Sequence, residues 1–232
     1  MQNNFLKNKK IILSAGASGI GLATVKLLLL QGAIVYTCDI DKKNINKLKK
    51  NSYFNKKLFI SECDASKEDE VKKFYKEISN KTKKIDGLIN NIGIAGPTSP
   101  LEKIKSDDWE KTLHVNVNSH FYFTKYAIPM IKKSKNGSII NISSTAGIDG
   151  FPNRSPYAAS KWALVGITKT LAMELGKFNI RVNAICPGSV KGARMMRVIK
   201  AKAKMCSFLI SQDSLRVSGQ VISIDGNTER MD

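Results

Sequence analysis

Residues 9–39 read KKIILSAGASGIGLATVKLLLLQGAIVYTCD, and this stretch decides the fold. Lys9 to Ser14 runs from basic to apolar like the start of a buried strand, residues 20–30 have helical apolar spacing, and residues 33–38 are a second strand-like run. Gly16, Gly19 and Gly21 stand between the first strand and the helix. This turn predicts a pyrophosphate site, because backbone N–H groups at a helix N-terminus attract phosphate and a Cβ would block its approach.

Asp39 ends the second strand-like run, eighteen positions after Gly21. An acid at this place accepts hydrogen bonds from the ribose of an adenosine, and the same carboxylate repels a 2′-phosphate. The turn holds Ser18 where a basic residue would favour that phosphate. NAD is therefore expected in preference to NADP, although Lys42 and Lys43 leave NADP open.

Strand and helix patterns continue to alternate after this unit. Residues 57–63 and 86–90 are strand-like, and residues 66–82 have a helical pattern between them. Crossovers of this length are helical and right-handed, which predicts a doubly wound parallel α/β sheet in a single domain over residues 1–232. Asp64 and Ala65 close the third strand, where Asp64 either meets an adenine edge or caps the following helix.

A second group of residues suggests proton chemistry. Tyr157 and Lys161 lie four apart at the start of an apolar helical run, so their side chains share one face. Moving a phenol from a pKa of ~10 to ~7 takes about 4 kcal/mol, roughly what one positive charge at about 4 Å supplies at an effective dielectric of ~20. Ser144 follows the apolar strand 138–142, at the edge where such sheets bind ligands. The alternative is a packed ring beside a solvated amine.

Composition bounds the remaining possibilities. The 232 residues carry 38 basic and 19 acidic side chains, a net charge of +19, but the lysines are spread along the chain, so nucleic-acid binding is not the expected task. No apolar run is long enough to span a membrane, and the start MQNN lacks the apolar core of a signal peptide. The four cysteines have neither paired nor metal-ligand spacing. We expect a cytoplasmic protein with reduced thiols and no metal.

Several motifs in order resemble the short-chain dehydrogenase/reductase family, over residues 9–194 and 218–226. The resemblance rests on the turn Ser14 to Gly21, the strand end Asn90-Asn91-Ile92-Gly93, Asn116, Ser144, the pair Tyr157-x-x-x-Lys161 and the turn Pro187-Gly188. It implies a Rossmann-type sheet and an NAD(P)-dependent oxidoreductase that interconverts a secondary alcohol and a ketone or 3-oxoacyl group.

The resemblance also implies the roles of individual residues. Ser144 and Tyr157 would hold the carbonyl while the phenol donates the proton, and Lys161 would lower the pKa of Tyr157 and bind the nicotinamide ribose. Asn116 would hold a water in the proton path, or is simply a polar residue in an apolar helix. The implied cofactor contacts are Ser14, Gly16, Ser18, Gly19, Ile20, Gly21, Asp39, Asp64, Ala65, Asn91, Gly93, Tyr157, Lys161, Pro187, Gly188 and Val190.

The sequence departs from the family pattern in three places. Ala15 replaces the first glycine of the turn, which strains the backbone if position 15 needs a positive φ. Gly192 stands where a threonine commonly touches the nicotinamide carboxamide. Only residues 188–219 separate the nicotinamide turn from the last strand-like segment, with a basic amphipathic stretch at 195–204 and the end of a packing helix at 206–210. Part of the substrate lid or of that helix is therefore expected to be missing.

The shortened segment keeps a second function open. Ile94, Phe151, Ser189 and Val190 would form a partly apolar substrate pocket that is more open to water than usual. The alternative to an enzyme is a catalytically impaired dinucleotide-binding protein with an assembly or sensing role, and a further alternative is a basic RNA-associated protein.

Two long helical runs bear on assembly. Residues 109–131 and 157–175 have few charges on any face, so each must be covered on more than one side. One side meets the sheet. The other is expected to meet a second copy in a homodimer or homotetramer, as the resemblance suggests, or to be buried within one chain.

Overall fold

The fold is a seven-stranded sheet in which every strand is parallel to its neighbours. The computed structural model describes residues 5–50, 57–188 and 193–225. The strand order confirms the predicted doubly wound single domain. In spatial order the strands are β3 (Leu58–Glu62), β2 (Ile34–Asp39), β1 (Lys10–Ser14), β4 (Gly87–Asn90), β5 (Gly137–Ile142), β6 (Ile180–Pro187) and β7 (Val221–Ile224).

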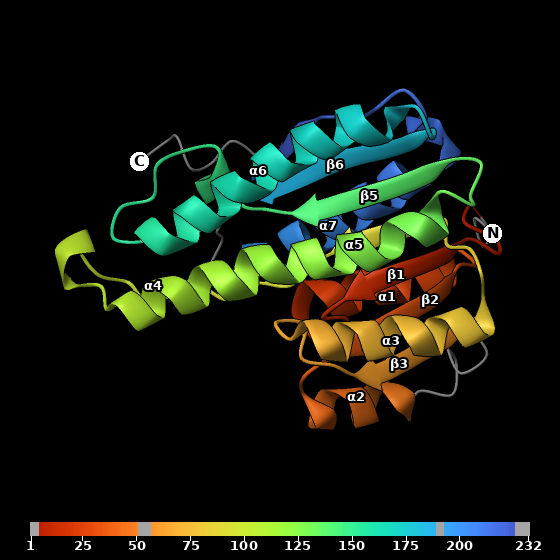
Figure 1. The fold of residues 1–232 in the computed structure, drawn as a ribbon, viewed down its shortest axis with the longest axis horizontal. Helices are drawn as coiled ribbons and strands as arrows, with labels where there is room; N and C mark the ends of the chain where they lie inside the picture. Colours follow the sequence, from red (N-terminus) through yellow and green to blue (C-terminus); the bar gives the residue numbers. More distant parts are fainter. Residues whose placement is uncertain (1–4, 51–56, 189–192, 226–232) are drawn as a thin grey trace.

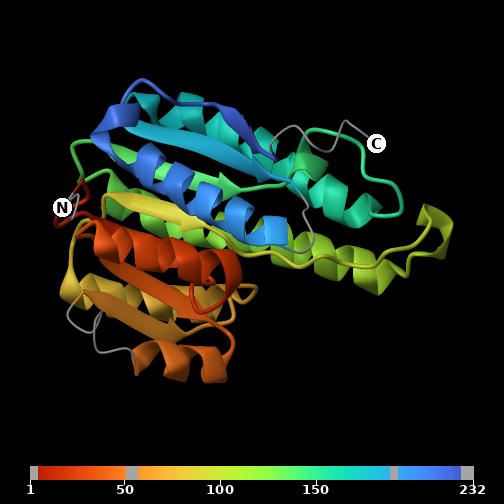
Figure 2. The same ribbon diagram turned by 180° about the vertical axis from the view of Figure 1, so that it is seen from behind.

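Helices cover both faces of this sheet. The helices α3 (Glu68–Lys81), α5 (Ser119–Ile131) and α6 (Ser155–Gly176) lie on the face turned to the viewer in Figure 1. The opposite face carries α1 (Gly19–Leu30) and α7 (Ala193–Ile210), as Figure 2 shows, and these two helices pack on each other. The helix α2 (Lys42–Lys49) packs on β2 and β3.

The apolar strand residues divide between the two faces because successive side chains of a strand point in opposite directions. Ile11 and Leu13 of β1 pack with α1 and α7, whereas Ile12 between them packs with α3 and α5. All three side chains are completely buried. Strands buried on both faces need continuous apolar runs, which explains why these segments show no polar alternation.

The strand order reverses between β1 and β4. The chain builds β1, β2 and β3 in one direction and then crosses back through α3 to place β4 on the other side of β1. Side chains brace the two strand ends: the Ser14 hydroxyl accepts from the Asn91 N–H at 3.0 Å, and the Asn91 amide donates to the Ala15 carbonyl at 3.1 Å. Ligands of open α/β sheets bind in the crevice at such a reversal.

The expected helix over residues 109–131 is more complex than its apolar pattern indicated. It begins earlier, with α4 (Ser106–Leu113), continues through a π-helical turn at His114–Asn118 and ends with α5. A π turn fits one extra residue into the helix and is frequent at functional sites. Apolar spacing does not reveal it, because the helix is continuous on both sides.

The segment after β6 also differs from the expectation of a truncated helix. Residues 195–204 and 206–210 belong to one continuous helix, α7, whose buried residues Cys206 and Leu209 join the core beneath α1. Pro187 ends β6 and Ala193 begins α7, so only residues 188–192 connect them. The helix over these residues is therefore present, whereas residues 189–192, which belong to the expected shortened lid segment, lie outside the described residues.

Candidate active site

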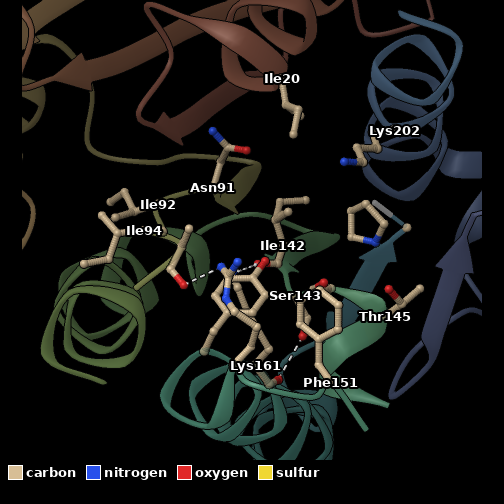
Figure 3. A pocket seen from close by; sticks show the side chains of 17 residues that line it. Ile20, Asn91, Ile92, Ile94, Ile142, Ser143, Thr145, Phe151, Lys161 and Lys202 are labelled. Atoms are coloured by element: carbon tan, nitrogen blue, oxygen red, sulfur yellow. Dashed lines mark hydrogen bonds between the residues drawn. The ribbon is translucent and has the colours of Figure 1, made fainter. Parts of the chain in front are cut away.

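A cavity of about 420 Å³ opens at the carboxyl ends of β1, β4, β5 and β6 (Figure 3). The resemblance named Ser144, Tyr157 and Lys161, and all three line it. Their companions come from six elements or loops and include both apolar and polar side chains. The lining is completed by Ile20, Asn91, Ile92, Gly93, Ile94, Ala95, Ile142, Ser143, Thr145, Phe151, Arg154, Pro187, Gly188 and Lys202.

Tyr157 and Lys161 lie one turn apart in the first part of α6, as their spacing predicted. The Lys161 Nζ is 5.6 Å from the centre of the Tyr157 ring, and both side chains face the cavity. The ammonium is held in place because it donates to the Ile142 carbonyl at 3.0 Å, at the end of β5. Strand and helix together therefore fix a positive charge beside the phenol.

Lys161 is 4% exposed, and its environment disfavours the charged form. Burial lowers the pKa of the Lys161 amine to about 8, and the nearby Lys202 charge acts in the same direction. Gly93 provides the space for this amine, since a Cβ on residue 93 would come within 3.2 Å of the Lys161 Nζ. The amine is thus buried, with Gly93 close by and the cavity beside it.

Ser144 is the second residue after β5, where the chain turns toward α6. Its Oγ accepts from the Ala146 N–H at 3.2 Å and begins the 3₁₀ turn Thr145–Gly147. The neighbouring Ser143 donates to the Lys161 carbonyl at 2.8 Å and ties the strand end to α6. The short turn and the loop after it explain how thirteen positions of sequence bring Ser144 and Tyr157 to one cavity.

Asn116 is fully buried in the π-helical turn, and its side chain is not among the cavity residues. Its role of holding a water stays a prediction. The Oδ1 accepts from the Ile94 N–H at 2.7 Å, and the Nδ2 donates to the Ile94 carbonyl at 3.0 Å and to Ser160 at 2.9 Å. The amide thereby positions the loop after β4 against α6.

Two cationic side chains in the cavity wall were missed by the sequence reasoning. The Arg154 guanidinium carbon lies 5.3 Å from the centre of the Tyr157 ring, and the group donates to the Ala95 carbonyl at 2.6 Å. Lys202 reaches the cavity from α7 and is buried. Arg154 could have been suspected from its closeness to Tyr157 in sequence. Lys202 offered only the weak signal of a lysine within an amphipathic run.

The glycine turn leaves the start of α1 without a side-chain cap from its N-cap residue. Ser18 is extended and its side chain makes no capping bond, so among the described residues it does not satisfy the first N–H groups of the helix. Gly19 has a φ of +50°, and a Cβ on it would meet nothing within 4 Å, so its face is open. Ile20 follows and lines the cavity. This end of α1 can receive an anion.

The other two glycines are needed for packing. A Cβ on Gly16 would lie 2.0 Å from the Thr37 Oγ1, and one on Gly21 would lie 2.0 Å from the Ala15 carbonyl oxygen. Ala15 has a φ of +56°, so the condition for strain at this position is met. The turn is closely packed at Gly16 and Gly21 and open at Gly19. This backbone shape fits a pyrophosphate.

The acids of the second and third strand ends are engaged with the backbone. Asp39 is buried; it accepts from the Ala17 N–H at 3.0 Å and from the Asp41 N–H at 3.1 Å, so it braces the glycine turn. Asp64 accepts from the N–H and the hydroxyl of Ser66. Burial alone would raise the pKa of Asp64, but the Ser66 hydrogen bonds and the Lys67 charge lower it.

The remaining predicted positions divide into three groups. Pro187 and Gly188 line the cavity, as do Ile94 and Phe151 of the expected substrate pocket. Ser14 and Ala65 are buried, with the Ser14 hydroxyl used between strands, so neither side chain is among the cavity residues. Val190, together with Ser189 and Gly192, lies outside the described residues.

Residues 9–204 match the family described as short chain dehydrogenase. The chain belongs to this family. It is 36% identical over 242 residues to the 3-oxoacyl-[acyl-carrier-protein] reductase FabG of Thermotoga maritima, which covers 95% of this chain and 98% of that protein. It is 34% identical over 207 residues to the 2,5-dichloro-2,5-cyclohexadiene-1,4-diol dehydrogenase of Sphingobium indicum, with 89% of this chain and 82% of that protein covered. The short-chain dehydrogenase is thus an NAD(P)-dependent oxidoreductase.

Solved structures agree with this assignment. Levodione reductase has a TM-score of 0.86 at 25% identity, covering 95% of this chain and 97% of that one. ElxO with NADP bound has a TM-score of 0.87 at 26% identity, covering 94% of this chain and 98% of that one. In the part of the chain that the structure describes, no helix is long and apolar enough to cross a membrane.

Proposed function

We propose that this short-chain dehydrogenase interconverts a secondary alcohol and a ketone or 3-oxoacyl group, with Tyr157 as the general acid and base. The observation that carries the proposal is the convergence of Tyr157, Ser144 and Lys161 on one cavity at the strand ends. The bound dinucleotide would supply or accept the hydride. Its pyrophosphate would be held by the backbone of residues 16–20, whose shape fits that group.

The side chains of the cavity then have separate tasks in carbonyl reduction. Ser144 donates a hydrogen bond to the substrate oxygen, and the Tyr157 phenol transfers its proton to the same atom as charge develops there. Lys161, held by the Ile142 carbonyl, keeps its ammonium beside the phenol and would bind the ribose hydroxyls of the dinucleotide. Asn116 acts through position: it fixes the loop of Ile94 against α6.

Substitution of the phenol tests the proposal directly. Tyr157→Phe should lower the rate of carbonyl reduction about 10²- to 10⁴-fold, because it removes the proton donor while keeping the ring. Binding of NADH should change little. The measurement is steady-state reduction of a panel of ketones and 3-oxoacyl thioesters, with NADH affinity followed by fluorescence on the same samples. Unchanged turnover in the variant would refute the role of Tyr157.

We further propose a preference for NAD over NADP. Asp39 ends β2 with its carboxylate beside the glycine turn, and a 2′-phosphate near it would meet a negative charge. ElxO, a structural neighbour, has NADP bound, so the fold itself does not exclude NADP. Asp39→Asn should make the affinities of the protein for NAD and for NADP more nearly equal. Tighter binding of NADP than of NAD by the unchanged protein would contradict the preference.

The alternative of an impaired dinucleotide-binding protein is favoured by one observation. The connection between β6 and α7 has only residues 188–192, so little chain is available to cover a substrate. In that case NADH would bind normally and no member of the substrate panel would be reduced. The same panel therefore separates the two functions.

We propose that α5 and α6 meet a second copy of the chain, in a homodimer or homotetramer. Phe121 of α5 and Trp162 of α6 are 51% and 50% exposed, and Met173 of α6 is 85% exposed, which is unusual for side chains of this size on one layer of helices. Trp162→Glu should dissociate the oligomer in analytical ultracentrifugation, whereas Leu30→Glu on α1 should not. The four free thiols are consistent with the proposed cytoplasmic location.

A further inference from the structure

Lys202 is a buried cation for which the proposed reaction has no use. It lies in α7, it is only 7% exposed, and it lines the cavity that also contains Lys161 and Tyr157. Figure 3 shows its amine directed from α7 toward the middle of the cavity. Within the described part of the chain, this amine has neither a hydrogen-bond acceptor nor a carboxylate partner. Lysine is rarely buried without one.

The charges around Lys202 increase the need for an anion. Lys161 and Arg154 line the same cavity, and none of the described lining residues is acidic. Burial lowers the pKa of the Lys202 amine to about 8, which reflects the cost of keeping the charge in this place. The Lys202 charge also lowers the pKa of the Lys161 amine. A negatively charged ligand would offset both the cost of burying these positive charges and the repulsion between them.

The position of Lys202 indicates which part of a ligand it would meet. The helix α7 packs against α1, and Ile20 of α1 lines the cavity together with Lys202. The start of α1 carries the N–H groups without side-chain caps and the open face of Gly19. Tyr157 and Ser144 belong to the wall built by β5 and α6, and therefore to the reacting end of the cavity. Lys202 is thus on the side of the glycine turn.

We propose that Lys202 is a further cofactor-binding residue, whose ammonium pairs with the pyrophosphate of the dinucleotide opposite the start of α1. The pyrophosphate would then be held between backbone N–H groups of the glycine turn and a side-chain cation from the far end of the chain. This inference rests on the proposed dinucleotide-dependent function. It assigns to α7 a direct part in binding, in addition to its packing on α1.

The test uses Lys202→Met, which keeps the length of the side chain and removes its charge, in the full-length protein. NADH and ADP-ribose, which shares the pyrophosphate but lacks nicotinamide, are titrated by calorimetry. Both should bind about 10- to 100-fold more weakly to the variant, the usual cost of losing one charged hydrogen bond. Lys204→Met, an exposed lysine of the same helix, is the matched control and should bind both normally. Lys202→Arg should restore most of the affinity.

Thermal unfolding without cofactor supplies a readout that a purely structural lysine would not give. Removal of a buried charge without a partner should raise the melting temperature of Lys202→Met, so the variant should be more stable and bind less well. A lower melting temperature would show that Lys202 supports the fold and would overturn the proposal. Lys204→Met should unfold like the unchanged protein.

The remaining outcomes separate this proposal from the proposed function. If the unchanged protein binds NADH and Lys202→Met binds NADH and ADP-ribose equally well, only the role of Lys202 is refuted. The same holds if the variant shows only a raised KM for 3-oxoacyl thioesters, because Lys202 would then meet the substrate. If the unchanged protein binds no dinucleotide at all, the proposed function itself falls.

Discussion

The two ends of the cavity are built in opposite ways. At the proposed reacting end, side chains line the wall, and partners fix them: Lys161 by the Ile142 carbonyl and Ser144 by the Ala146 N–H. At the glycine turn, residues 15–21 act through backbone shape, and their side chains are small or absent. Substitutions at the first end should therefore change chemistry, and those at the second should change fit and folding.

The largest effect is expected at the reacting end. Lys161→Met removes the charge beside the phenol and the hydrogen bond to the Ile142 carbonyl, and should lower kcat for carbonyl reduction about 10³-fold. The free energy of unfolding at neutral pH should change less, because relief from burying the charge offsets the lost hydrogen bond. Stopped-flow reduction and chemical denaturation on the same sample check both statements. A large loss of stability with unchanged kcat would show that Lys161 supports the fold and not the reaction.

At the glycine turn, substitutions should affect stability and cofactor binding more than the chemical step. A Cβ at residue 21 would lie 2.0 Å from the Ala15 carbonyl and 2.8 Å from the Asn91 amide, so Gly21→Ala should destabilise the protein by about 2–3 kcal/mol. NADH binding should weaken as the turn shifts. Gly166→Ala in α6 is the control: a Cβ there meets nothing within 4 Å, and helix propensity predicts a gain of about 0.5–1 kcal/mol.

The change in the free energy of unfolding with pH measures the contribution of the buried Lys161 amine. The pKa of Lys161 is about 8 in the folded protein and ordinarily 10.5, so between these values the unfolded chain binds more protons. The free energy of unfolding then rises with pH through this interval, by up to about 3 kcal/mol for this group. Relative to Lys161→Met, the unchanged protein should therefore gain stability from pH 8 to 10.5. Urea denaturation of both proteins measures the difference and cancels other titrating groups.

The smallest effect is expected at Ala15. With a φ of +56°, alanine costs about 1–2 kcal/mol that glycine would not, and the greater freedom of glycine in the unfolded chain offsets about half. Ala15→Gly should thus stabilise the protein by about 0.5–1 kcal/mol. Ala17→Gly, two residues along the same turn, should destabilise it instead. Equal effects of the two changes in thermal unfolding would mean that the turn is not strained.

The same contrast explains what could be predicted from the sequence. The strands, the glycine turn and the meeting of Ser144, Tyr157 and Lys161 follow from local patterns, because apolar runs and short spacings fix them. Lys202 could not be found in this way, because its approach depends on how α7 packs against α1.

Side-chain partners were equally hidden from the pattern. Asn116 was expected to hold a water in the proton path, and its amide binds Ile94 and Ser160. Ser14 was expected at the cofactor, and its hydroxyl joins two strand ends. Both roles stay predictions. A polar residue at a site edge has many acceptors and donors within reach, and only the three-dimensional arrangement decides among them.

The π-helical turn at His114–Asn118 holds one residue more than ordinary α-helical winding needs. Deletion of that residue would restore α-helical winding and leave α5 in nearly its present orientation relative to α4. Phe123 would stay buried, but the Asn116 amide would lose the place from which it binds Ile94. The extra residue thus serves the loop after β4, and the hydrophobic interior does not depend on it.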